Sequence, residues 1–105
     1  MTLEQIALNK TMQTAAVAAD SRTAEGLTYI GECLRQFYAG NYGIVPAEDT
    51  EANNSELAAG YGRIVARYKA AAGLKEDIYI IAFFNADEPN NTDANYTIVH
   101  YVSEY

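Results

Sequence analysis

Few residues of this sequence have the type and spacing that catalysis requires. His100 is the only histidine and Cys33 the only cysteine, and the two lie far apart along the chain. A multi-histidine metal site is therefore excluded, and a local thiol–imidazole pair is not expected. His100 alternates with Ile98 and Val102, which favours a hydrogen-bonded histidine in a strand over a general base. Cys33 lies beside an apolar stripe, so we predict a small core residue rather than a nucleophile.

Carboxylates are more numerous, but their spacing matches no known cation loop. Asp87, Glu88 and Asp93 lack the alternating ligands and the distal glutamate of an EF-hand. The sequence also has no CxxC, no HExxH, no phosphate-binding glycine loop and no nucleophile elbow. We therefore predict no catalytic residue, no metal site and no cofactor, and we expect a protein that is not an enzyme.

The tyrosines and basic residues raise the question of nucleic-acid binding. Nine tyrosines could stack on single-stranded bases, and Arg63, Arg67 and Lys69 could contact the backbone. However, fourteen acidic against seven basic residues give a net charge of -7, which repels phosphate groups. The charge weighs against nucleic acid and favours a protein partner with a basic surface. An acidic balance that only keeps the domain soluble is the alternative reading.

The length and composition predict one domain over residues 1–105. Half of the 105 residues are hydrophobic, which is enough for a packed core without disulfides. The sequence starts without the basic and apolar regions of a signal peptide, and its richest apolar run, 78–84, is far too short to span a bilayer. We expect a cytoplasmic protein that does not bind membranes.

Two helices are predicted in the first half of the chain. The first covers 24–39, with Thr23 as its N-cap and an apolar stripe at spacings of three and four. The stripe consists of Leu27, Ile30, Leu34 and Phe37. The second begins at Pro46 and ends at Gly60, with Leu57 as its one large apolar anchor. This second helix is polar almost all round, and its carboxylates form the first part of a predicted partner-binding surface: Glu48, Asp49, Glu51 and Glu56.

The second half alternates with a period of two, which predicts strands. The expected strands are 61–69, 77–85 and 96–103, separated by loops over 70–76 and 86–94. Residues 1–22 fit either a strand or a helix; we favour a short strand over 5–11 and a helical turn over 15–20. The predicted fold is an α+β two-layer sandwich, in which an antiparallel sheet of three to four strands carries two or more helices on one face, in the approximate order β-α-α-β-β-β.

One face of this sheet is expected to lack a cover. If the helices cover the side with Ile64, Ile80 and Ile98, the other side is an apolar patch that needs a partner, a dimer mate or the N-terminal segment. The residues of the expected patch are Val65, Ile81, Phe83, Val99 and Tyr101. We take Phe83 and Tyr101 as the second part of the partner-binding surface.

A spaced pattern of residues resembles a known group of proteins. The pattern consists of Gly40-Asn41-Tyr42-Gly43, Glu48-Asp49, Asn53-Asn54, Leu57, Gly60, Ile64, Tyr68, Asp77-Ile78-Tyr79-Ile80-Ile81 and Glu104-Tyr105. It resembles small proteins of plasmids and other mobile elements of gut Firmicutes, which carry general labels such as plasmid-related or restriction-modification protein. The chain departs from them in having tyrosines where members often have tryptophan and in a longer 86–94 loop, and no catalytic residues carry over.

The resemblance implies a setting, because mobile elements carry small acidic proteins that block restriction enzymes or CRISPR nucleases. The leading hypothesis is a non-catalytic inhibitor, anti-CRISPR or anti-restriction, that binds a host defence nuclease through its acidic helix and uncovered sheet face. The alternative is a homo-oligomeric structural or regulatory module with no nuclease target, whose uncovered face is a dimer interface.

Overall fold

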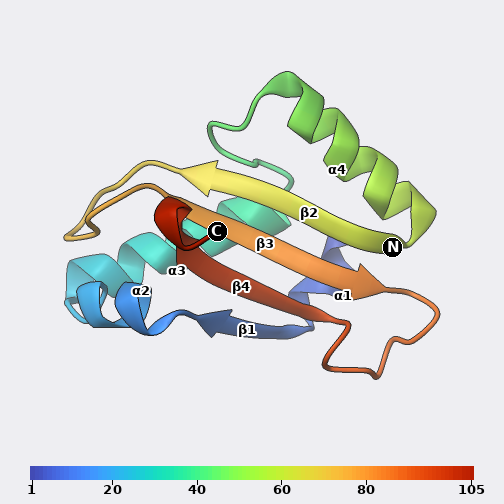
Figure 1. The fold of residues 1–105 in the computed structure, drawn as a ribbon, viewed down its shortest axis with the longest axis horizontal. Coiled ribbons are helices and arrows are strands. Elements are labelled where there is room, and N and C mark those ends of the chain that lie inside the picture. Colours follow the sequence, from blue (N-terminus) through green and yellow to red (C-terminus); the bar gives the residue numbers. More distant parts are fainter.

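A four-stranded sheet forms one layer of the molecule and helices form the other (Figure 1). The computed structural model describes all 105 residues. The strands are β1 (Lys10–Gln13), β2 (Tyr61–Tyr68), β3 (Ile78–Asn85) and β4 (Tyr96–Tyr101). They lie in the order β1-β4-β3-β2, in which β2, β3 and β4 are antiparallel and β1 runs parallel to β4. The predicted α+β sandwich is confirmed, with the difference that the sheet is mixed rather than wholly antiparallel.

The helices are α1 (Leu3–Ala7), α2 (Ala15–Asp20), α3 (Ala24–Tyr38) and α4 (Ala47–Ala59), followed by a final 3-10 turn, η1 (Val102–Glu104). In Figure 1 the sheet lies between the viewer and α3, and α4 runs beside β2 at the edge of the sheet. The bounds of α3 and α4 agree with the two predicted helices, and Gly60 ends α4 in a left-handed conformation. No helix has both the length and the apolar content needed to traverse a bilayer.

The N-terminal segment differs from the prediction of a strand over 5–11. Residues 3–7 form α1, and the strand β1 begins only at Lys10. A capping box explains the difference, because the Thr2 hydroxyl accepts from the Gln5 backbone N–H and the Gln5 side chain accepts from the Thr2 N–H. Ile6 is then fully buried in the core. The helical turn over 15–20 is confirmed as α2.

The core lies between α3 and the sheet. From α3, Ile30, Cys33 and Phe37 are buried, whereas Leu27 is 58% exposed and Leu34 is only half-buried. The buried stripe is therefore rotated from the predicted one, toward the side with Cys33 and with Gly26, which packs against the Ser21 backbone so closely that a Cβ would overlap it. From β3, alternate residues fill the other half of the core: Ile78, Ile80, Ala82 and Phe84.

The register of β4 differs from the prediction, so part of the expected uncovered face consists of other residues. Ile80 pairs with Val99 and Ile78 with Tyr101, so Val99 and Tyr101 point toward the helices, and Ile98 points away from them. Tyr101 is 4% exposed; its hydroxyl donates to the Asp20 carboxylate. Both faces of β4 carry apolar residues, and in such a strand a shift by one residue exchanges the faces.

Strand β4 also ends earlier than predicted, at Tyr101 rather than at residue 103. The Glu104 side chain accepts hydrogen bonds from the Tyr101 backbone N–H and from the Thr14 hydroxyl, both at 2.9 Å. Ser103 is bound to the Glu76 carboxylate through its N–H and its hydroxyl. These contacts turn the chain into η1 and direct the last residue back over the sheet.

Candidate functional site

The side of the sheet opposite α3 carries no helix apart from the short η1 turn, and we call it the open face (Figure 1). The register places on it the odd residues of β2 and β3 and the even residues of β4. Among these are Arg63, Val65, Arg67, Tyr79, Ile81, Phe83, Tyr96, Ile98 and His100. The predicted uncovered face therefore exists, although Ile98, Tyr96 and His100 take the places expected for Val99 and Tyr101.

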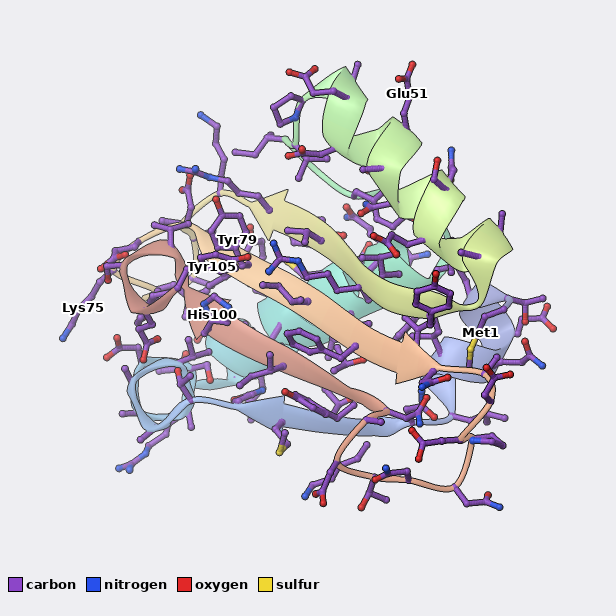
Figure 2. All side chains as sticks on the ribbon, turned by 45° about the vertical axis from the view of Figure 1, so that its right-hand side comes forward. Met1, Glu51, Lys75, Tyr79, His100 and Tyr105 are labelled. Carbon is purple, nitrogen blue, oxygen red and sulfur yellow. The ribbon has the colours of Figure 1, made fainter.

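Tyr105 lies across the open face and completes an aromatic cluster there (Figure 2). Its ring centroid is 5.4 Å from that of Tyr79 and 5.7 Å from that of His100. The Arg63 guanidinium carbon lies 5.4 Å from the Tyr105 ring centroid, within cation–π range, and the same guanidinium donates to the Tyr105 hydroxyl. We call Tyr79, His100, Tyr105 and Arg63 the aromatic cluster.

His100 is held in this cluster by the backbone carbonyl of the next residue, Tyr101. Its Nδ1 lies 2.8 Å from the Tyr101 carbonyl oxygen, which can only accept a hydrogen bond. Nδ1 therefore carries a proton, and the buried ring packs against Tyr79 and Tyr105. This agrees with the prediction of a hydrogen-bonded histidine in a strand.

The charge of Arg67, another arginine of the open face, is neutralised by Asp77. Arg67 donates to the Asp77 Oδ2 atom from Nε at 3.1 Å and from a terminal nitrogen at 2.9 Å, and its guanidinium lies 5.8 Å from the Tyr79 ring centroid. The Ala70 backbone N–H donates to the other carboxylate oxygen at 2.9 Å. The bonds from Ala70 and Arg67 hold the pKa of Asp77 below its usual value of 3.8.

The Asn53 side chain of helix α4 forms a pair of hydrogen bonds with the edge of the sheet. Asn53 accepts from the Val65 N–H at 3.0 Å and donates to the Val65 carbonyl at 2.9 Å, so its amide acts as a short strand partner for the edge of β2. Asn53 is 3% exposed. Asp49 and Glu56 lie four residues before and three after it, on the same side of the helix. The attachment therefore brings these two carboxylates to the open face.

Glu56 lies against a position that only glycine can occupy. Gly62 has a φ of +121°, and a Cβ atom built there would overlap the Glu56 carboxylate. The backbone of β2 thus leaves the space in which the half-buried Glu56 side chain rests. This contact fixes the direction in which Glu56 points.

A pocket of about 360 Å³ lies between α4 and the aromatic cluster. Its polar and aromatic walls are Asp49, Asn53, Glu56, Arg63, Tyr79 and Tyr105. We call it the α4 pocket. A second, more apolar hollow of about 380 Å³ adjoins it, shares Arg63 and Tyr105 with it, and includes Phe83, Tyr96 and Ile98. The two hollows together extend over most of the open face.

The structure brings together three of the six predicted partner-binding residues. Asp49 and Glu56 line the α4 pocket, and Phe83 lines the adjoining hollow with its ring 5.0 Å from that of Tyr96. Glu48 and Glu51 lie outside both hollows, and Glu51 points away from the sheet (Figure 2). Tyr101 is on the helix-covered side, so its expected place on the open face was wrong.

The other chemistry-bearing residues lie elsewhere. Cys33 is buried in the core, as predicted, and this burial raises the pKa of its thiol. The structure holds no group of three or more His, Cys, Asp or Glu side chains that could bind a metal ion. The 86–94 loop is exposed, as predicted, and is fixed by the Asn95 amide, which donates to the Glu88 and Asn91 carbonyls.

Two residues of the site were not predicted from the sequence. Asn53 is one of many polar residues of α4, and only its backbone partner distinguishes it. Tyr105 follows the last strand, and its return over the sheet depends on the η1 contacts.

No protein-family model, no curated protein and no solved structure matches this chain.

Proposed function

We propose that the protein is a non-catalytic inhibitor that binds a nuclease with a basic surface, with host CRISPR effectors and restriction enzymes as the expected targets. The open face is the contact surface, and the carboxylates of α4 attract the partner. The observation that carries this proposal is the position of an acidic helix at the edge of an uncovered, partly apolar sheet face.

The charges of α4 support a basic partner. The helix contains no lysine or arginine, and Glu48, Asp49, Glu51 and Glu56 take part in none of the three ion pairs of the structure. Their charge is therefore not neutralised by an ion pair within the molecule. Such a field raises the rate of association with a basic surface, and a nuclease exposes one where it holds DNA or RNA.

The open face supplies apolar contact area beside these charges. Phe83, Tyr96 and Ile98 are half-buried and contiguous around one hollow. Aromatic anchors next to a charged rim are typical of protein-binding surfaces. The choice of a defence nuclease rests on the sequence resemblance to mobile-element proteins and on the net charge of -7.

A reconstituted assay tests this proposal. The purified chain is mixed with candidate CRISPR effectors and restriction enzymes, and each mixture is analysed by size-exclusion chromatography and by DNA cleavage. We expect co-elution with a target and loss of cleavage at equimolar ratio, both weakened by added salt. Cleavage that persists throughout the panel, with no co-elution, would count against the proposal.

A homo-oligomeric module remains the second candidate, favoured by the apolar hollow around Phe83, which no acidic residue lines. Light scattering separates the two candidates, because a tight dimer would bury the open face without a foreign partner. Charge reversal at Glu48, Asp49, Glu51 and Glu56 is expected to abolish nuclease binding and to leave such a dimer intact.

A further inference from the structure

We propose that the α4 pocket accepts the guanidinium group of an arginine side chain presented by a protein partner. This inference rests on the proposed function, since it names the chemistry that the site recognises in its partner. The charge and the shape of the pocket and the fixed position of one of its carboxylates support it.

The charge of the pocket leaves room for one cation. Asp49 and Glu56 contribute two negative charges and Arg63 contributes one positive charge, so the side chains of the pocket walls carry a net charge of -1. None of these three side chains forms an ion pair. A single incoming guanidinium would neutralise the pocket, whereas a phosphate group would meet two carboxylates.

The aromatic walls suit a planar cation. The rings of Tyr79 and Tyr105 are tilted by 57° with centroids 5.4 Å apart, and together they form a corner of the pocket. Each ring already has an arginine within cation–π range, Arg67 at Tyr79 and Arg63 at Tyr105. Guanidinium stacks on aromatic faces and pairs with carboxylates through a planar fork, unlike the compact, strongly hydrated lysine ammonium.

One of the two carboxylates, that of Glu56, is placed before any partner arrives. The two hydrogen bonds between Asn53 and Val65 hold α4 against β2, and the Glu56 carboxylate rests over Gly62. Little freedom of the Glu56 side chain is then lost when a ligand binds, which favours affinity. The pocket volume of about 360 Å³ is sufficient for the end of an arginine side chain.

NMR titration of the ¹⁵N-labelled chain with Nα-acetyl-arginine methylamide tests this assignment, with the corresponding lysine derivative as the matched probe. We expect chemical-shift changes at Ala52, Asn53 and Val65, with a dissociation constant on the order of millimolar for a single side chain. The lysine derivative is expected to bind several-fold more weakly.

Three substitutions in the pocket are expected to change the affinity for the arginine derivative, two of them lowering it and one raising it. Glu56→Gln and Asp49→Asn are each expected to weaken arginine binding by about tenfold, because a charge-assisted contact is lost. Arg63→Gln is expected to strengthen it, because the net charge of the pocket becomes more negative. Glu51→Gln, on the outer side of the same helix, is the control and is expected to leave the affinity unchanged.

Equal binding of the arginine and lysine derivatives, or unchanged affinity in both Glu56→Gln and Asp49→Asn, would overturn the assignment. The outcomes also separate this inference from the proposed function. Arginine binding without inhibition of any nuclease would contradict the proposed function but not the pocket assignment. A nuclease complex whose affinity is unaffected by Glu56→Gln and Asp49→Asn would contradict the pocket assignment but not the proposed function.

Discussion

The Asn53 side chain and the Val65 backbone form two hydrogen bonds, of 2.9 and 3.0 Å, that join α4 to the edge of the sheet. This pair protects an edge strand from pairing with other chains, because it occupies both backbone groups that Val65 turns outward. It also sets the position of Asp49 and Glu56. The Asn53 amide therefore helps to place the acidic side of the α4 pocket.

Replacing Asn53 by alanine leaves the Val65 N–H and carbonyl without partners at a position where α4 limits access of water. We expect Asn53→Ala to lower the free energy of unfolding by about 2 kcal/mol, measured by urea denaturation. Asn54→Ala, at the exposed neighbouring position, is the control and is expected to change it by less than about 0.5 kcal/mol. Similar losses in both variants would show that the Asn53 contact is not formed.

Alanine substitutions at Gly62 and at Gly31 form a second test with a matched control. Gly62→Ala adds a Cβ that overlaps the Glu56 carboxylate at a φ of +121°, so we expect a loss of about 1–3 kcal/mol and displacement of Glu56. Gly31 lies inside α3 with no atom near its Cβ direction, so Gly31→Ala is expected to gain about 0.5–1 kcal/mol. Thermal unfolding measures both, and a stable Gly62→Ala variant would contradict the account of β2.

The ion pair of Asp77 with Arg67 predicts an acid dependence of stability. The folded pKa of Asp77 is lowered from 3.8, so its stabilising effect is complete above the unfolded pKa and is lost as the pH falls through the lower folded value. We expect Asp77→Asn to be less stable than the parent chain at neutral pH and to approach it as the pH falls below 3.8. Urea midpoints at several pH values on both sides of 3.8 measure this, and a difference that stays constant as the pH is lowered would contradict it.

Phe83 tests the apolar part of the open face. It is half-buried beside Tyr96, and aromatic anchors contribute most to binding when the partner covers them. We expect Phe83→Ala to weaken nuclease binding by about tenfold or more, measured by isothermal titration calorimetry. Leu27→Ala, exposed on α3 on the other side of the sheet, is the control. Equal affinities of both variants would place the contact elsewhere.

The elements with strong local signals could be predicted from the sequence. Helix α3 has an N-cap and an amphipathic stripe, α4 starts after Pro46 and ends at Gly60, and β3 is apolar on both sides as a central strand must be. The capping box of Thr2 and Gln5 was also a readable signal for α1, and the weak alternation after Gln5 obscured it.

The remaining errors concern relations between distant segments. Which side of β4 meets the helices depends on the pairing of Ile80 with Val99 across a long loop, and both sides of β4 are apolar enough for either choice. The Asn53–Val65 bonds and the position of Tyr105 over Tyr79 are likewise tertiary contacts. The acidic helix and the uncovered face could therefore be predicted, but the pocket that joins them could not.

Methyl NMR of the chain titrated with a nuclease whose cleavage it suppresses tests the central claim most directly. If the open face is the contact surface, the methyl signals of the half-buried Ile98 shift or broaden as the complex forms, and those of Leu27 and Leu34 on α3 stay unchanged. Changes confined to the α3 side of the molecule, with Ile98 unaffected at saturation, would contradict the account.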